Sequence, residues 1–517
     1  MEKTQECKLN VIITLAGKSL RFAREGFKKD KFLLSTGKNS IVLDHVVQMF
    51  NPNDSFHFII SNKQSKKKGL KNIILKTVQK GKIYIVDDHN KGPVYSVLKL
   101  KGLDEKEPVI ISYCDFFVKW DYQRFLRNIY AIDGSIPVFR GFHPSSFTGT
   151  LYAYVKSNKK NNFISIREKK SYTKNPNKEY ASCGIYYFKS LEIFKFFAKK
   201  LLKTSSKEAY VSLIFNLMKK SNLKLNIFEV EKFICLGTPL DFRIYLYWKK
   251  FFEQNFRFTS KIVFPGANLI PMSGEGKRFK EYGYRVTKPL IEINKKPMLI
   301  NACITFPKTK NWNFVINKNH NRNNRIGKMI NQISDQSNII TVNKITEGPA
   351  ASCFLAKKFI DKNEPLFISS CDYLTIFNEK KFHKLIQNKE IDGIVWTYKL
   401  NNLIVKSFNN FGYCIVDRNH VLKKIIEKKI ISDKPYNDQM LLGSFWFKKA
   451  EYFFNNFVDA VKSKNLINSE YYVGNNINLL LKKKMKFITF EIDQWISLND
   501  PFELKVYEYW KKLFENK

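Results

Sequence analysis

The sequence lacks any long hydrophobic run. Its 517 residues are 44% hydrophobic, but no window approaches the roughly 20 consecutive apolar residues that a membrane-spanning helix requires. The apolar stretch at 11–16 is also too short for the core of a secretion signal, and acidic as well as basic residues precede it. We therefore expect a soluble, cytoplasmic chain with no transmembrane segment.

Cysteine is scarce and scattered. The eight cysteines form no Cys-x-x-Cys pair, and none has a histidine nearby at zinc-ligand spacing. This pattern does not indicate a zinc site, and reduced thiols in the cytoplasm are its simplest interpretation.

Acidic residues are few relative to basic ones. Lys and Arg number 89 against 46 Asp and Glu, which gives a net charge of +43. Such an excess is typical of proteins that bind nucleotides, nucleic acids or other anionic surfaces. A low-GC genome produces the same excess, because it enriches Lys, Asn, Ile, Phe and Tyr together. We favour this second explanation and expect no specific nucleic-acid partner, since the basic residues form no stripe.

The sequence contains an internal duplication. Short motifs of the first half recur in the second half in the same order and at a nearly constant offset. The matched pairs are Gly17–Phe22 with Gly274–Phe279, Lys31 with Lys288, Gly92–Pro93 with Gly348–Pro349, Asp115 with Asp372, Glu168–Lys170 with Glu427–Lys429, and Tyr247–Lys250 with Tyr509–Lys512. A register kept over a whole domain indicates two homologous folds. We predict two domains, residues 1–257 and 258–517, hereafter domain one and domain two.

The repeat places the domain boundary after the helix that carries Trp248. Domain two then begins at a strand over 262–264 or shortly after it. The connection, residues 254–261, has no Pro/Gly/Ser-rich run, so we expect the two domains to be held close together.

Strand-like and helix-like segments alternate within each half. The clearest predicted strands are residues 11–15, 58–61, 83–86 and 109–113, and the clearest predicted helices are residues 190–202 and 209–220. This alternation favours a mostly parallel sheet with helices on both faces.

A glycine-rich loop follows the first strand of each copy. In domain two, Gly274 and Gly276 let backbone amides approach phosphate oxygens, and Arg278 adds positive charge. A Gly-x-Gly run alone also marks any tight turn. The motif becomes specific because Lys288 follows, and Pro289 fixes the chain so that the ammonium can face a transferring phosphoryl group.

A carboxylate ends one buried strand of each copy, Asp115 in domain one and Asp372 in domain two. The ligand crevice of an open α/β sheet lies at the carboxyl ends of its strands, and a hard oxygen ligand there suits Mg²⁺. A strand-end aspartate that merely caps a turn is the alternative. The repeat favours the metal site.

The run from Gly274 to Met298 resembles the signature of sugar-phosphate nucleotidyltransferases (nucleotide-sugar pyrophosphorylases). Gly283–Tyr284, Lys288–Ile291 and Lys296–Met298 are similar to the capsular-polysaccharide branch of that family. The resemblance covers nearly the whole chain, twice. It implies two tandem GT-A-like, Rossmann-related α/β domains, each a mostly parallel mixed sheet flanked by helices. It also implies attack of a sugar phosphate on the α-phosphorus of an NTP with Mg²⁺ as cofactor and release of pyrophosphate, for surface polysaccharide biosynthesis.

The resemblance also implies roles for single residues. It implies catalytic roles for Arg278, Lys288 and Lys428 in domain two, and for Arg21, Lys31 and Lys169 in domain one. It implies nucleotide binding by Ser273, Gly274, Gly276, Glu347 and Gly348, and by Ala16, Gly17 and Gly92. It implies substrate binding by Glu427, Gly443, Glu168 and Gly184, and metal binding by Asp372 and Asp115. In the Glu-Lys-Lys motif the cation suits an acceptor phosphate and the carboxylate a hydroxyl. Taken alone, that tripeptide would be an exposed charge cluster.

Both copies depart from the family pattern. Domain one has Ser19 at the position of Gly276, and Asp30 and Phe32 where the family places prolines around the lysine. Many members carry a second metal carboxylate two residues before a late glycine. Cys235 and Ser497 stand at that position here.

The leading hypothesis is a nucleotidyltransferase whose better-formed site is in domain two. Its partners are then an NTP and a phosphorylated sugar or alcohol, and association with polysaccharide-assembly enzymes is compatible with it. Domain one is expected to bind a nucleotide or sugar phosphate more weakly or with different specificity. The alternatives are a GT-A glycosyltransferase that uses a nucleotide sugar, one catalytic domain beside a binding or scaffold domain, and a non-enzymatic nucleotide sensor.

Overall fold

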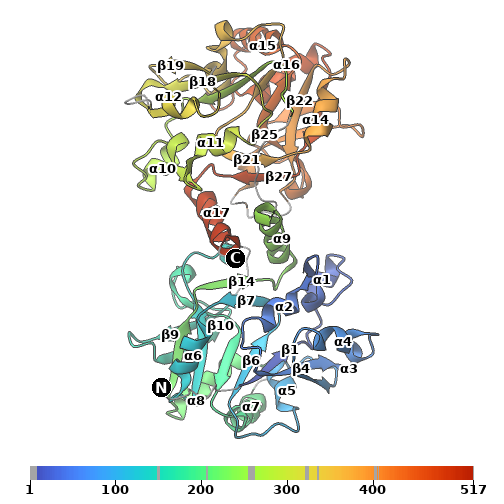
Figure 1. Cartoon of the computed structure of the whole chain (residues 1–517), viewed down its shortest axis with the longest axis vertical. Coiled ribbons are helices and arrows are strands. Elements are labelled where there is room, and N and C mark those ends of the chain that lie inside the picture. Colours follow the sequence, from blue (N-terminus) through green and yellow to red (C-terminus); the bar gives the residue numbers. More distant parts are fainter. Residues whose placement is uncertain are drawn as a thin grey trace. The chain divides into compact units, whose positions relative to one another are not determined.

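The computed structural model of the chain (Figure 1) describes residues 9–147, 152–204, 208–253, 262–320, 325–334, 337–400, 405 and 407–515. The chain divides into two compact units, Met1–Tyr247 and Trp248–Lys517. This division falls within helix α9 (Pro239–Glu253), whereas the repeat placed the boundary after residue 257. The predicted connection, 254–261, lies outside the described residues.

Domain one is built on a mixed sheet of short, apolar strands. These are β1 (Asn10–Thr14), β4 (Ser55–Ser61), β5 (Gly81–Val86), β6 (Val109–Tyr113), β8 (Gly134–Phe139), β9 (Ala153–Ser157), β10 (Phe163–Glu168), β11 (Tyr180–Ser182), β12 (Ile185–Phe188) and β13 (Leu225–Glu229). They follow the order β10-β9-β11-β8-β12-β6-β1-β4-β5, and β13 pairs with β8. Because β1 runs parallel to both β4 and β6, the carboxyl ends of these strands meet at one edge.

Helices and small hairpins complete domain one. The helices are α1 (Leu20–Arg24), α2 (Val42–Val47), α3 (Asn62–Ser65), α4 (Leu70–Leu75), α5 (Pro93–Leu98), α6 (Tyr122–Ile129), α7 (Leu191–Thr204) and α8 (Ile214–Lys220), with 3₁₀ turns η1 (Lys31–Leu33), η2 (Pro144–Phe147), η3 (Pro176–Lys178) and η4 (Val211–Leu213). Two small antiparallel pairs join β2 (Ser35–Gly37) to β3 (Ser40–Ile41), and β7 (Phe116–Lys119) to the distant β14 (Lys232–Cys235). Apolar faces of α5, α7 and α8 pack on the sheet and form a continuous buried core.

Domain two repeats this architecture. Its strands are β15 (Ala267–Met272), β18 (Asn311–Asn317), β19 (Ser337–Val342), β20 (Leu366–Ile368), β22 (Gly393–Tyr398), β23 (Gly412–Val416), β24 (Leu422–Ile426), β25 (Gln439–Phe447) and β26 (Phe487–Glu491), with the small pairs β16 (Glu292–Ile293) and β17 (Lys296–Pro297), and β21 (Tyr373–Ile376) and β27 (Gln494–Ser497). The main path is β19-β18-β15-β20-β25-β22-β26, with β23 joining β25 to β24.

The helices of domain two also correspond to those of domain one. They are α10 (Lys277–Glu281), α11 (Met298–Cys303), α12 (Arg325–Ile330), α13 (Pro349–Phe354), α14 (Glu379–Ile386), α15 (Ala450–Lys462), α16 (Val473–Lys482) and α17 (Pro501–Phe514), with 3₁₀ turns η5 (Lys288–Leu290), η6 (Lys318–His320), η8 (Lys357–Phe359), η9 (Phe408–Asn410) and η10 (Pro435–Asn437). The core packs α13, α15 and α16 against the sheet, as α5, α7 and α8 do in domain one.

The two topologies match strand for strand, except that β25 is one long strand where domain one has β11 and β12. This confirms the predicted duplication and the α/β fold. One local expectation was wrong, and another was right only in part. Residues 262–264 form no strand but a single β-bridge at Val263, and the predicted helix over 209–220 begins as the 3₁₀ turn η4 before α8.

Candidate active site

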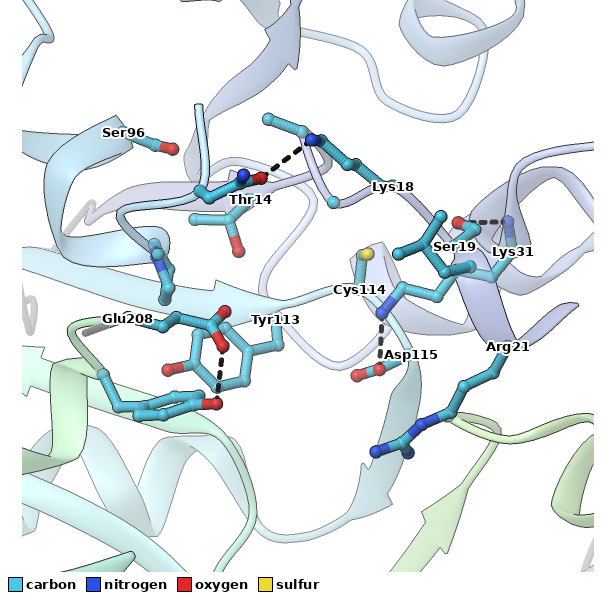
Figure 2. Close-up of a pocket in the computed structure, with 18 of the residues that line it drawn as sticks. Thr14, Lys18, Ser19, Arg21, Lys31, Ser96, Tyr113, Cys114, Asp115 and Glu208 are labelled. Atoms are coloured by element: carbon cyan, nitrogen blue, oxygen red, sulfur yellow. Dashed lines mark hydrogen bonds and ion pairs between the residues drawn. The ribbon is translucent and has the colours of Figure 1, made fainter. Parts of the chain in front are cut away.

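A pocket of about 510 Å³ opens at the carboxyl ends of β1 and β6 in domain one (Figure 2). Six residues predicted from the sequence line it: Ala16, Gly17, Arg21, Lys31, Gly92 and Asp115. They come from four separate segments of the chain. The sheet brings these segments together because parallel strands end at one edge.

The glycine-rich loops of the two domains share one backbone conformation. Ser19 in domain one has φ 49° and Gly276 in domain two has φ 65°, so each enters its helix in the left-handed region. For a serine this costs about 1 kcal/mol. The Ser19 hydroxyl offsets part of this cost by accepting a hydrogen bond from the Lys31 backbone N–H at 3.3 Å.

The signature lysine and the strand-end aspartate form an ion pair in both domains. The Nζ–Oδ2 distance is 2.6 Å for Lys31 with Asp115 and 2.6 Å for Lys288 with Asp372, and Figure 2 shows the first pair. Both lysines begin a 3₁₀ turn, η1 and η5. Domain one forms this turn with Phe32 at the position that Pro289 holds in domain two.

Each pair also perturbs a pKa. Burial lowers the pKa of Lys31, but the Asp115 carboxylate outweighs it and holds that pKa above its ordinary value. Burial raises the pKa of Asp372, but Lys288 and the Ser370 hydroxyl bring it below its ordinary value. Both groups are therefore charged at neutral pH.

Domain two adds partners that the sequence did not reveal. The Asn499 side-chain oxygen accepts from Lys288 Nζ at 2.9 Å, and the Ser370 hydroxyl donates to Asp372 Oδ1 at 2.6 Å. Gly237 and Tyr113 take the equivalent positions in domain one and line its pocket. The only sequence signal was that Asn499 stands where the family motif has its late glycine.

In each domain, a carboxylate from the last helix contacts the residue that stands at the position of the second metal carboxylate. Asp241 approaches Cys235 from α9. In domain two, Glu503 of α17 accepts from the Ser497 hydroxyl at 2.5 Å and from the Asn499 backbone N–H at 3.0 Å. Burial raises the pKa of Glu503. Because these hydrogen bonds come from residues that precede α17, the Glu503 carboxylate caps the start of that helix.

The donor set fits a divalent cation that arrives with the nucleotide. No cluster of three or more His, Cys, Asp or Glu that could hold a metal occurs within the described ranges. Mg²⁺ often binds through one or two carboxylates plus substrate phosphates rather than in an all-protein cage. Asp115 and Asp372 offer one such carboxylate each.

The glycine that precedes α5 in domain one and α13 in domain two is required by close packing. Gly92 has φ 83° and Gly348 has φ 101°, which disfavours any other residue. A Cβ on Gly92 would lie 2.6 Å from the Ala209 carbonyl oxygen, and one on Gly348 would lie 2.8 Å from the Tyr471 backbone. The side chain of Glu347 is exposed.

Polar groups around this loop differ between the domains. In domain one, His89 Nε2 lies 2.9 Å from the Ser96 hydroxyl, and Lys18 Nζ donates to Asn90 at 2.7 Å. Burial and nearby lysines lower the pKa of His89, and its Nδ1 accepts from the Lys91 N–H, so the ring is neutral with its proton on Nε2. Sequence reasoning missed His89, Asn90 and Ser96.

Domain two replaces that arrangement with a chain of hydroxyls. Ser352 lies 2.9 Å from Ser273 and 2.5 Å from Thr346. Ser273 is buried, and its hydroxyl lies beside that of Ser352. The equivalent loops ahead of α5 and α13 thus share a glycine conformation but present different polar atoms.

The Glu-Lys motif adopts a strained conformation in both domains. Lys169 has φ 53° and Lys428 has φ 56°, and a non-glycine residue held there twice indicates a functional constraint. Lys169 Nζ donates to the Tyr210 hydroxyl at 3.0 Å, and Tyr210 lines the pocket. Lys428 Nζ donates to the Asn410 carbonyl at 2.8 Å.

The remaining predicted residues lie at the rim of this arrangement. Gly184 has φ 89° and Gly443 φ 81°, and the Gly184 carbonyl accepts from the Tyr113 N–H at 3.1 Å. Arg21 and Arg278 are exposed, and neither forms an ion pair with another described residue. Glu168, Lys169 and Gly184 adjoin the pocket through Tyr113 and Tyr210 rather than lining it.

In each domain the glycine-rich loop, the paired lysine and the strand-end carboxylate lie at one edge of an α/β sheet, and the chain holds two such domains. The chain belongs to the nucleotidyl transferase family, whose model matches residues 16–249 and 267–511. Within the part of the chain that the structure describes, no helix has both the length and the hydrophobicity for crossing a membrane.

Solved structures similar to the chain have the size of a single domain. A nucleoside-diphosphate-sugar pyrophosphorylase from Vibrio cholerae is 18% identical, and the match covers 46% of this chain and 98% of that one with a TM-score of 0.39. An inositol-1-phosphate CTP transferase from T. maritima is 16% identical, with 48% and 96% covered and a TM-score of 0.38. A UDP-glucose pyrophosphorylase in complex with UDP-glucose is 16% identical, with 50% and 100% covered and a TM-score of 0.39. No curated protein matches the chain.

Proposed function

We propose that each domain transfers a nucleoside monophosphate from an NTP to a sugar phosphate, or to a similar phosphorylated building block, and releases pyrophosphate. The supporting observation is the lysine–aspartate pair, which recurs with the same 2.6 Å distance beside a phosphate loop in both domains. A site abandoned in one copy would have no reason to keep this pair, its loop backbone and the strained Glu-Lys motif together.

The chemistry follows from these groups. The acceptor phosphate oxygen attacks the α-phosphorus, a bond to that oxygen forms, and the bond to the pyrophosphate oxygen breaks. Lys31 or Lys288 leaves its aspartate to neutralise charge on the phosphates, and Arg21 or Arg278 adds a second cation. Asp115 and Asp372 would hold Mg²⁺, which supplies further charge neutralisation at the phosphates when bound.

The acceptor would be held by the Glu-Lys motif. Lys169 or Lys428 pairs with its phosphate, and Glu168 or Glu427 accepts from a hydroxyl. Ser273, Gly274, Gly276, Glu347 and Gly348, and in domain one Ala16, Gly17 and Gly92, surround the nucleotide in this proposal. Gly184 and Gly443 flank the acceptor. We further propose a role in surface polysaccharide biosynthesis, for which the capsular-type signature is the support.

Pyrophosphate release tests the proposal directly. The full chain is incubated with Mg²⁺, each of four NTPs and a panel of phosphorylated sugars and alcohols. The Lys31→Ala chain then reports on domain two alone, and the Lys288→Ala chain on domain one alone. We expect release from both. Release that survives in the Lys31→Ala/Lys288→Ala double variant would contradict the assignment, and release from no combination would contradict the function.

A further inference from the structure

The carboxylates of the two Glu-Lys motifs lie in different chemical surroundings. Glu168 ends β10, and Glu427 directly follows β24. Equivalent asparagines hold the two strands, since Asn216 accepts from the Ile166 N–H and Asn478 from the Ile425 N–H. The two carboxylates therefore occupy equivalent positions, and their neighbours can be compared residue by residue.

In domain one the carboxylate already has a donor within the protein. The Ser212 hydroxyl, in the 3₁₀ turn η4 ahead of α8, donates a short hydrogen bond to Glu168. Phenol groups surround the pair: Tyr113 lines the pocket, and Tyr186 accepts from the Ser182 hydroxyl at 3.1 Å. The Glu168 charge is thus partly satisfied before any ligand arrives.

Domain two lacks three of these hydroxyls at the equivalent positions, and the fourth, on Ser370, bonds Asp372 instead. In domain two, Gly474 occupies the position of Ser212, Ser370 that of Tyr113, Phe445 that of Tyr186, and Leu441 that of Ser182. A Cβ on Gly474 would lie 2.5 Å from Glu427 Oε1 and 2.8 Å from the Leu441 side chain. Backbone and aliphatic groups therefore lie against the carboxylate, with the Cys414 thiol and the Tyr472 phenol as further neighbours.

The Glu427 carboxylate has no hydrogen-bond donor among the residues that the structure describes. Ser370 is turned away, since its hydroxyl donates to Asp372. Burial raises the pKa of Glu427 to about 7, although the neighbouring Lys428 opposes this shift. A carboxylate in this state gains most from a donor that a ligand brings.

We propose that domain two selects acceptors that bring a hydroxyl to Glu427, whereas in domain one Ser212 already bonds Glu168, so that acceptor phosphates with and without that hydroxyl are both used. The inference rests on the proposed transfer to a phosphorylated acceptor. Its physical basis is that a site built to bond a hydroxyl strongly rejects the analogue without it, because the site's own polar group is left unpaired.

The test uses full chains with one site silenced, Lys31→Ala for domain two and Lys288→Ala for domain one. Each receives its accepted sugar phosphate and the full set of monodeoxy analogues. We expect one analogue to lower kcat/KM at domain two by about 30-fold or more, and no analogue to lower it at domain one by more than about 3-fold. Gly474→Ser should reduce the loss at domain two to about 5-fold, and Ser212→Gly should create a loss at domain one.

A pH profile separates this role from simple packing. The discrimination at domain two should rise as pH increases through about 7, because the ionised carboxylate is the stronger acceptor, and Glu427→Gln should remove that rise. Equal losses at both sites, or discrimination that does not change with pH, would overturn the inference while leaving the proposed function intact. Absence of pyrophosphate release from every NTP and acceptor would overturn the proposed function itself.

Discussion

The two domains share the lysine–aspartate pair and differ in the residues that contact it. Lys288 and Asp372 are further bonded by Asn499 and Ser370, whereas domain one has Gly237 and Tyr113 there. The domain-two pair is also more buried, with side-chain exposures of 16% and 18% against 22% and 26%. Duplication has kept the charges and changed the groups that position them, which would adapt the proposed reaction to two substrates.

The largest effect should come from the signature lysines. Lys288→Ala should lower domain-two turnover about 100-fold or more, because it removes the cation that faces the phosphates. Lys31→Ala should do the same for domain one. Pyrophosphate release from the single variants, each with its own accepted substrate pair, measures both. If either variant lost both activities, the sites would not be independent.

Gly348→Ala should destabilise the protein by about 2–3 kcal/mol, because it forces a Cβ into the Tyr471 backbone at φ 101°. The matched control is Gly274→Ala, whose Cβ would meet nothing within 4 Å. That variant should keep its unfolding temperature and lose NTP affinity. Thermal unfolding and calorimetric titration with NTP separate the two glycines, and equal losses of stability would contradict their different roles.

Asn499→Gly should make domain two resemble domain one. Lys288 loses one acceptor, and a hydrogen bond from a charged, partly exposed group is worth about 1 kcal/mol, so turnover should fall about 5-fold. The variant keeps the backbone N–H at position 499, which donates to Glu503. Gly237→Asn is the reciprocal change in domain one, and steady-state kinetics of both sites measure the pair. An unchanged domain two would show that Asn499 does not position the lysine.

The Glu427 carboxyl should make stability depend on pH. Its pKa is about 7 in the folded chain against an ordinary 4.5, so the folded state holds a proton that the unfolded chain releases, and stability falls as pH rises through this window. Glu427→Gln should therefore gain about 1 kcal/mol relative to the parent between pH 4.5 and 8, after discounting for solvent screening.

The control for this pH effect is Glu168→Gln, where Ser212 supports the charged form and the gain should be smaller. Thermal unfolding at both pH values measures the two variants. A larger gain for Glu168→Gln would reverse the comparison of the two carboxylates.

The smallest effect is expected at Ser19. Ser19→Gly relieves the left-handed strain but removes the hydrogen bond from the Lys31 N–H, so the two terms should cancel to within about 0.5 kcal/mol. Ser19→Ala keeps the strain and loses the hydrogen bond, and should be the less stable variant. Chemical denaturation of the two variants ranks them, and a more stable Ser19→Ala would show that the hydroxyl does not tether the loop.

The sequence predicted the site elements that are local. The loop after β1, the lysine ahead of its turn and the aspartate at the end of β6 each lie within one short segment, and strand ends can be placed from buried apolar runs alone. The four clearest predicted strands occur within a few residues of their predicted bounds. The strand expected at 262–264 was wrong because a short apolar run also fits an irregular segment, and here Phe264 is buried while Val263 is 52% exposed.

By itself, then, the sequence determined the duplication, the α/β class and the positions of the paired charges, because each repeats as a local pattern. Only the tertiary structure decided which side chains surround those charges. Asn499 reaches Lys288 across 211 positions of the chain, and Ser212 reaches Glu168 across 44. Such partners carry no local signature, since packing of distant segments brings them together. That packing decides what a carboxylate contacts: a hydroxyl in domain one, and glycine and leucine in domain two.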